Sequence, residues 1–195
     1  FVVNHSYASV GIYAVTLTVT DNDGATGSKT AVITVLNRSP VALFTQSATS
    51  VLTQVAVQFN ASASYDPDGT IVTYSWNFGD GSNALGAITS HAYSHSGVYT
   101  ITLTVTDNDG ATGTAQSTVT ILNRPPVASF TKSASTVFTG QAIYFNASAS
   151  YDPDGSIVNY FWTFGDGTNG TGVQISHTYA DNSVYTITLK VTDND

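Results

Sequence analysis

The stretch YSWNFGDG (74–81) and its copy YFWTFGDG (160–167) decide the fold of this 195-residue chain. In both stretches large apolar side chains alternate with smaller ones and end at a Gly-Asp-Gly turn, which is the pattern of a strand with one buried face. The alternation places Trp76 and Trp162 on the inward face, where an indole ring buries a large apolar area. We therefore predict that both are core residues rather than sugar-stacking platforms.

The same stretches belong to a repeat that covers the whole chain. The string TDND begins at Thr20, Thr106 and Thr192, so successive copies lie 86 residues apart. The connectors LNRSPVA (36–42) and LNRPPVA (122–128) punctuate the repeat, because proline fixes φ and removes an N–H donor. We predict the C-terminal half of a domain at 1–36, a complete domain at 37–122, and a domain lacking its last strand at 123–195.

Other segments also read as strands. Apolar residues alternate strictly with Thr along YTITLTVT (99–106), and Val55, Val57 and Phe59 alternate in the same way. No segment has the spacing of an amphipathic helix, and turn residues recur every 8–15 residues, as in an all-β sandwich. The tyrosines that begin the TDND strand, Tyr99 and Tyr185, are predicted to join the core.

Composition excludes several function classes. Charged residues make up 9% of the chain, the net charge is −8, and all thirteen acidic residues are Asp. Five basic residues are too few to form a basic surface that binds nucleic acid. Because the chain has no Cys, it has neither disulfides nor thiolate metal sites. No apolar run approaches the roughly 18 residues of a membrane span. The neutral, hydroxyl-rich surface is typical of a wall, sheath or filament, and we expect an extracellular or cell-surface location.

Several spaced motifs together resemble the PKD (polycystic kidney disease) domain family. These are PPVASF (125–130), SxDPDG before each Trp strand, the WxFGDG signature, and HxYxxxGxYxxTLTVTDNDGAT (91–112). The resemblance covers essentially the whole chain and implies seven-stranded immunoglobulin-like β-sandwiches in a linear array, as in archaeal and bacterial cell-surface proteins. One departure occurs near Asn182, where ADNSVYTITL replaces SHSGVYTITL, and we expect it to affect a single turn.

The resemblance also implies a possible calcium site. Some PKD domains of bacterial collagenases bind calcium between the entry linker, the D-x-D-G loop and the Asp of the TDN turn. Calcium prefers six to eight such hard oxygen ligands. The alternative is that these Asp residues serve turn chemistry alone. The matching positions are Asn37, Asp66, Asp68 and Asp107 in the complete domain, and Asn123, Asp152, Asp154 and Asp193 in the next.

Other polar residues favour structural roles. Asp80 and Asp166 lie in Gly-Asp-Gly turns, and we predict an Asx-type turn rather than a glycosidase carboxylate, which needs a partner across a cleft. The H-x-Y histidines recur once per repeat, which favours a packed, hydrogen-bonded imidazole over a zinc ligand. His95 does not recur and is expected to be exposed. These histidines are His5, His91 and His177.

Sequons suggest a glycoprotein. Asn4, Asn60, Asn146 and Asn169 stand in N-x-S/T sequences, and Asn37 is a weaker site because Pro40 follows its serine. Such triplets also arise by chance in a chain rich in Asn, Ser and Thr. If the protein is secreted by a glycosylating organism, some of these residues are expected to carry sugar.

The predicted function is a non-catalytic structural repeat module of an extracellular assembly such as a filament, a sheath or an S-layer. The alternatives are an adhesin whose loops bind a ligand, and a spacer of a secreted hydrolase. The expected partners are other copies of the chain, with surface glycans or envelope proteins as further candidates. Uncharged Thr rows on the outer strand faces favour lateral association, because charges ordinarily keep sheets apart.

Overall fold

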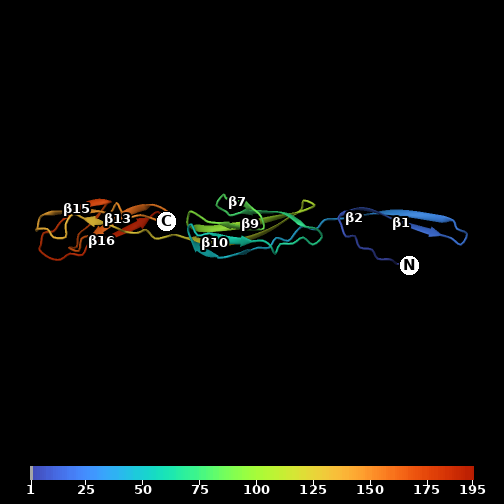
Figure 1. Ribbon diagram of the computed structural model, residues 1–195, viewed down its shortest axis with the longest axis horizontal. Coiled ribbons are helices and arrows are strands. Elements are labelled where there is room, and N and C mark those ends of the chain that lie inside the picture. The colour runs from blue at the N-terminus through green and yellow to red at the C-terminus, as the bar shows by residue number, and fades with distance from the viewer. Residues whose placement is uncertain (1) are drawn as a thin grey trace. The chain divides into compact units, whose positions relative to one another are not determined.

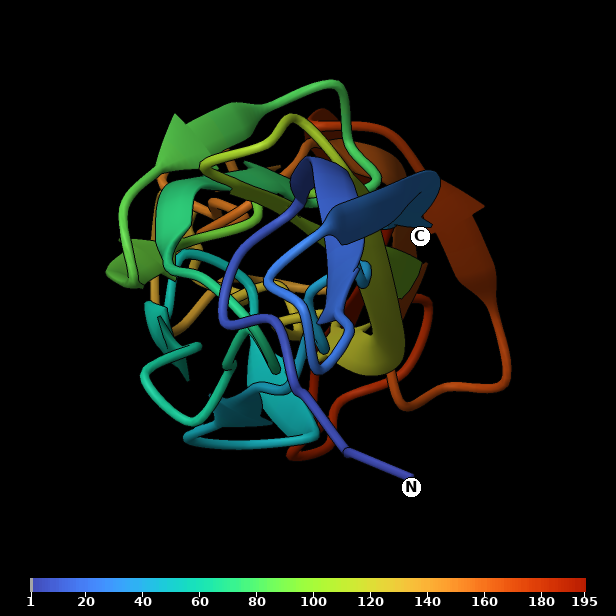
Figure 2. The ribbon, with the colours of Figure 1, turned by 90° about the vertical axis from the view of Figure 1, so that its right-hand side faces the viewer.

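The computed structural model describes residues 2–195, and within that range the chain forms strands and turns but no helix (Figures 1 and 2). Accordingly, no helix in this range could cross a bilayer. The all-β class predicted from the alternation is confirmed. The chain divides into two compact units: residues up to Thr49 with Val57–His91 and Tyr99–Val119, and Ser50–Ala56 with Ala92–Val98 and Thr120–Asp195.

A two-stranded hairpin opens the first unit. Its strands β1 (Gly11–Thr20) and β2 (Thr26–Val35) pair antiparallel along their whole length. The connecting turn is closed by Asp21, whose Oδ1 accepts hydrogen bonds from the N–H groups of Asp23 and Ala25, each at 2.9 Å. Apolar side chains such as Ile12 and Leu17 stay exposed, because two strands alone have no opposing sheet to cover them.

The central repeat forms a sandwich of two sheets. Its core aromatic side chains come from both sheets: Phe59 and Trp76 are fully buried, with ring centroids 5.7 Å apart. Trp76 Nε1 donates to the carbonyl of Gly86 at 2.8 Å, so the indole N–H is satisfied inside the core. One sheet has the order β3 (Thr45–Gln46), β5 (Val57–Asn60), β8 (Ile88–His91). The other has the order β4 (Ser50–Leu52), β10 (Thr112–Leu122), β9 (Gly97–Asp107), β6 (Ile71–Asn77), β7 (Asn83–Leu85).

The strand predicted through Val55 begins later than the alternation suggested. β5 starts at Val57, and Val55 is 39% exposed. A turn precedes the strand, in which the N–H of Val55 donates to the carbonyl of Leu52 and Gln54 has a positive φ of 62°. The apolar side chain at position 55 therefore continues the pattern without continuing the strand.

The third repeat, in the second unit, builds the same two-layer core. Phe145 and Trp162 come from opposite sheets with centroids 5.5 Å apart, and Trp162 Nε1 donates to the carbonyl of Gly172 at 2.9 Å. The other buried members of the cluster are Ile143, Ala147, Phe164, Tyr179 and Leu189. One sheet contains β11 (Thr131–Lys132), β12 (Ala142–Asn146) and β15 (Gln174–Thr178), and the other contains β14 (Asn169–Thr171), β13 (Ile157–Thr163) and β16 (Thr188–Asp193).

The strand that follows Asn182 is shorter than its counterpart in the central repeat. β16 has 6 residues, whereas its counterpart β9 has 11. β6 pairs only with the later part of β9, from Thr102 onward, and β10 is the neighbour of β9 on the other side. In the third repeat β16 is an edge strand that pairs with β13. Tyr99 and Tyr185 are both half-buried rather than fully enclosed.

Candidate functional site

Polar side chains gather where each connector enters its repeat. We call Asn37, Asp66, Asp68 and Asp107 the central linker cluster, and Asn123, Asp152, Asp154 and Asp193 the third linker cluster. In the central cluster Asn37 Nδ2 donates to Asp107 Oδ2 at 2.9 Å, and the N–H of Arg38 donates to Asp68 Oδ2 at 3.2 Å. Two consecutive connector residues are thus each bound to a loop of the repeat that follows them.

The third linker cluster repeats this geometry. Asn123 Nδ2 lies 2.9 Å from Asp193 Oδ2, and the N–H of Arg124 lies 3.1 Å from Asp154 Oδ2. The repeated positions that the sequence singled out for a cation are therefore brought together in both repeats.

A tight approach between two loops fixes the position of the carboxylates. The side chain of Asn108, in the TDND turn, accepts a hydrogen bond from the N–H of Thr70 at 2.7 Å. Gly69 lies so close that an added Cβ would stand 2.3 Å from Asn108 Oδ1 and 2.6 Å from Asp66 Oδ2. The glycine of D-P-D-G is required for this approach, which holds the two acidic loops against each other.

The carboxylates of the central linker cluster differ in acidity. Burial works to raise the pKa of Asp107, but hydrogen bonds from the Asn37 amide and from the N–H groups of Ala111 and Asp109 outweigh it, so the pKa is lowered. The pKa of Asp66 is raised, by burial and by the negative charges of Asp107 and Asp68. The cluster therefore holds one stabilised carboxylate and one that lacks compensating positive charge.

Each cluster also contains buried oxygen atoms without a hydrogen-bond partner. These are Asn37 Oδ1 and Asp66 Oδ2 in the central cluster, and Asn123 Oδ1 and Asp154 Oδ1 in the third. Buried polar atoms are ordinarily satisfied, so each such atom requires an explanation. Within residues 2–195 no three His, Asp or other ionisable ligand side chains converge closely enough to form a ready-made metal cage. The amide and carboxylate oxygens fit a hard cation in their chemistry, although they are not preassembled around one.

A histidine–aspartate pair, which the sequence reasoning missed, fastens each Gly-Asp-Gly turn. His91 Nε2 lies 2.6 Å from Asp80 Oδ2, and His177 Nε2 lies 2.7 Å from Asp166 Oδ2. Each imidazole also stacks on the phenylalanine that precedes the turn, with centroids 4.3 Å from Phe78 in one repeat. The constant separation of 11 residues between Asp and His was the signal available. His5 packs instead edge-on against a tyrosine, Tyr7.

The Asp of this turn also forms the predicted Asx bond. Asp80 Oδ1 accepts from the N–H of Ser82 at 2.9 Å, and Asp166 Oδ1 accepts from the N–H of Thr168 at 3.0 Å. Both oxygens of each carboxylate are therefore engaged in holding the turn. His95, predicted to be exposed, is exposed.

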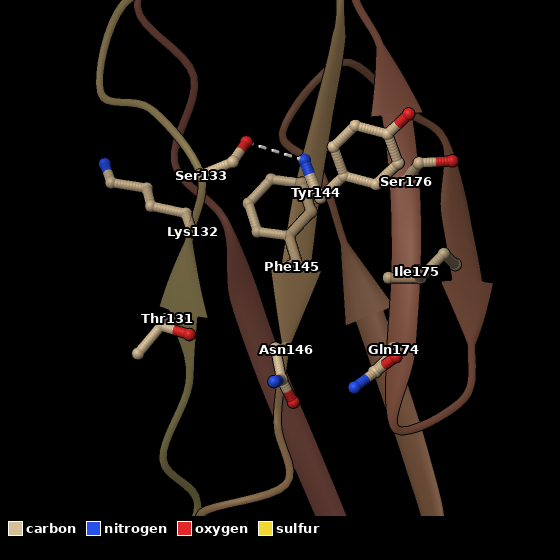
Figure 3. Close-up of a pocket in the computed structure, with 9 residues that line it drawn as sticks. All are labelled: Thr131, Lys132, Ser133, Tyr144, Phe145, Asn146, Gln174, Ile175 and Ser176. Carbon is tan, nitrogen blue, oxygen red and sulfur yellow. Dashed lines mark hydrogen bonds between the residues drawn. The ribbon is translucent and has the colours of Figure 1, made fainter.

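A surface groove of about 490 Å³ crosses β11, β12 and β15 of the third repeat (Figure 3). Its most prominent side chain is Tyr144, which is 63% exposed and lies beside Ser176 in the close-up. The N–H of Tyr144 donates to Ser133 Oγ at 3.0 Å. Apart from Lys132 the lining is uncharged, so the groove offers an aromatic ring, hydroxyls and amides rather than a paired acid and base.

The sequon asparagines differ in access. Asn4, Asn60 and Asn169 are exposed, and Asn37 and Asn146 are half-buried. The Nδ2 atom, which would carry a glycan, already donates to Asp107 in Asn37. Glycosylation of Asn37 would therefore disrupt the central linker cluster, whereas the three exposed sites carry no such conflict.

Comparison with known families identifies one family along nearly the whole chain. The PKD domain family matches residues 2–35, 37–121 and 123–195. Among characterised proteins, the pre-pro-metalloprotease PrtV of Vibrio cholerae is 33% identical over 164 residues, which cover 83% of this chain and 17% of that protein. Collagenase ColA of Clostridium perfringens is 36% identical over 92 residues, covering 47% of this chain and 8% of the collagenase. The chain thus spans less than a fifth of either relative.

A solved structure matches a single repeat. The crystal structure of the PKD1 domain of Vibrio anguillarum Epp is 36% identical to this chain and is covered to 96%, while the match covers 44% of this chain with a TM-score of 0.39.

Proposed function

The chain belongs to the PKD domain family, and from this premise we propose that it is a non-catalytic structural module of a secreted or cell-surface protein. The proposal rests on the observation that two consecutive residues of each connector are hydrogen-bonded to the following repeat. Asn37 and Arg38 bind the repeat that follows them through a side chain and a main-chain N–H, and Asn123 and Arg124 do the same. A connector bound at consecutive residues acts as a joint rather than as a free tether.

The relatives support the coarser part of this proposal. PKD repeats form part of a metalloprotease and of a collagenase, whereas the family matches in this chain leave no room for a further domain within residues 2–195. A spacer of a secreted hydrolase and a repeat of a surface filament, sheath or S-layer both use such a module. The few charges on the chain and the exposed Thr112, Thr114 and Thr118 of β10 favour the second, with other copies of the chain as partners.

The joint can be tested by measuring distances within the protein. The chain has no Cys, so spin labels can be attached to Thr104→Cys and Lys190→Cys, which are equivalent positions in the two repeats. We expect a narrow distance distribution that broadens in Asn123→Ala, and no hydrolysis of protein or glycan substrates. A distribution already broad in the unmodified chain, or turnover of a substrate, contradicts the proposal.

We further propose that calcium occupies the linker clusters. Asn37 Oδ1 and Asp66 Oδ2, buried and unpartnered, would serve as ligands with Asp68 and Asp107. The ion would offset the burial and the repulsion that together raise the pKa of Asp66. Asn123 and its three carboxylates would hold a second ion. Calorimetry with calcium and with chelator tests this, because an ion that binds only the folded state raises the melting temperature. Equal melting temperatures, with no metal in elemental analysis, contradict it.

A second candidate function, adhesion, rests on the groove around Tyr144. The exposed ring with hydroxyl and amide neighbours suits a neutral saccharide. The equivalent face of the central repeat has Gln58 in place of Tyr144 and serves as an internal control. A glycan-array signal that Tyr144→Ser abolishes and Gln58→Ser leaves unchanged would support adhesion, and no signal for the unmodified chain would remove it.

A further inference from the structure

One turn of the second unit contains a polar residue that is buried in one repeat and exposed in the other. Thr53, in the turn that follows β4, has an exposed fraction of 0%. Its counterpart 86 residues later, Thr139, is exposed. Because the two turns begin with the same residue, the difference must come from what lies against Thr53.

The residues against Thr53 are an arginine of the connector and an aspartate of the D-P-D-G loop. The guanidinium of Arg124 donates twice to the carbonyl of Thr53, from Nε at 3.2 Å and from Nη2 at 3.1 Å. The hydroxyl of Thr53 donates to Asp154 Oδ2, and that same oxygen accepts the N–H of Arg124 at 3.1 Å. Thr53, Arg124 and Asp154 therefore form a closed hydrogen-bonded ring in which charged groups take part in most of the bonds.

A neighbouring side chain extends the contact. Gln54 Nε2 donates to the carbonyl of Pro153 at 3.2 Å. Gln54 is the one non-glycine residue with positive φ in residues 2–195, at 62°, whereas the equivalent position in the third repeat is Gly140 with φ 76°. The backbone at this position favours glycine, and glutamine is accommodated where its side chain reaches the next D-P-D-G loop.

The other connector provides a matched comparison. Arg38 and Asp68 are the counterparts of Arg124 and Asp154, and their main-chain bond has nearly the same length. Yet Arg38 and Asp68 are exposed, whereas Arg124 and Asp154 are half-buried. The Thr53–Gln54 turn binds the side chain of Arg124, and Arg38 lies elsewhere in the fold. The main-chain bond belongs to the repeat itself, and the burial of the arginine depends on the preceding turn.

We propose that the Thr53–Gln54 turn is a docking surface for the connector arginine and D-P-D-G loop of the next repeat, and that Arg124 is the residue that locks the joint. The exposed Thr139–Gly140 turn is a second copy of this surface, which fits the Asn-Arg connector of another PKD repeat. This inference deepens the proposed structural role and rests on it, since it names the partner that each joint binds.

The two arginines of the chain, Arg38 and Arg124, make a direct test possible. Nitrogen-15 labelling of arginine alone gives two Nε–H signals, which Arg38→Lys assigns by removing one. We expect the Arg124 Nε–H to exchange with water at least tenfold more slowly than that of Arg38, with calcium and with chelator alike. Thr53→Val, which keeps the carbonyl, should leave most of this protection, and Asp154→Asn should reduce it.

Equal exchange rates at the two arginines would overturn the inference. The outcome is separable from failure of the proposed function. If Arg124 is unprotected while the spin-label distribution between positions 104 and 190 stays narrow, the joint exists without the arginine lock. If Arg124 is protected but the distribution is broad, the docking surface exists and the proposed joint does not.

Discussion

The central and third linker clusters contain the same residue types at nearly the same distances, yet they are enclosed to different degrees. Asp107 is buried and Asp193 is half-buried, whereas Asp68 is exposed and Asp154 is half-buried. The N–H groups of Asp109 and Ala111 both bind Asp107 at 2.9 Å. In the third cluster the hydroxyl of Thr53 binds Asp154. Equivalent residues in a tandem array thus share their local bonds and differ in what their neighbours provide.

The largest expected difference in stability comes from substitutions in the two cores, which test whether the central and third repeats are equivalent. Trp76→Ala and Trp162→Ala should each cost about 3–5 kcal/mol in the free energy of unfolding, since each removes a fully buried indole and leaves a cavity. Because both indoles make the same bond to a glycine carbonyl, the two costs should agree within about 1 kcal/mol, which is well below either cost. Urea unfolding followed by circular dichroism, with Trp→Phe variants as references, measures both.

Unequal costs would show that the repeats are not interchangeable cores. A melting transition unchanged by Trp76→Ala would contradict the core assignment altogether.

A smaller effect should separate the two clusters. Asn37→Ala removes a hydrogen bond to a buried carboxylate and should cost about 1.5–3 kcal/mol, the range for bonds to charged groups. Asn123→Ala should cost less, because Asp193 is more exposed and can turn to water. Chemical unfolding of both variants in chelator, compared with Asn60→Ala at an exposed site, gives the difference. A larger cost at Asn123 would reverse the comparison.

The smallest expected effect is the loss of stability at low pH. The hydroxyl of Thr168, with the help of His177, lowers the pKa of Asp166 to about 2. Burial works to raise the pKa of Asp80, but the hydrogen bond from His91 outweighs it and the pKa is lowered. Since both folded-state values lie below the unfolded one near 4, each pair stabilises its turn at neutral pH. This contribution is lost as the pH falls through the folded-state pKa.

Carbon-13 titration of the Asp carboxyls checks this prediction. Thr168→Ala should raise the midpoint of Asp166, because it removes the hydroxyl bond of 2.6 Å. Ser82→Ala is the matched change beside Asp80 and should have the smaller effect. A midpoint for Asp166 at the ordinary value would mean that the turn bonds seen here do not persist in solution.

Sequence reasoning reached the fold because the signals for it are local. Alternation around Trp76 and the 86-residue period require no knowledge of distant contacts, and the period also placed Asn37 and Asp107 together through the family resemblance. The Asp80–His91 pair was missed because it depends on strand register, which alternation does not fix. The burial of Thr53 could not be predicted either, since its cause lies in another repeat. The alternating pattern wrongly suggested that the strand begins at Val55, because a turn residue can continue such a pattern.

The placement of Asn123 and Arg124 side by side has a consequence for how such a chain can lengthen. Adjacent connector residues bind forward to Asp193, within the next repeat, and backward to Thr53. Gene duplication or unequal recombination that adds whole multiples of 86 residues preserves every joint, wherever in the repeat the crossover falls. A residue inserted between Asn123 and Arg124 would separate the two attachments. The joint therefore permits changes in the number of repeats, and it selects against insertions that separate the two connector residues.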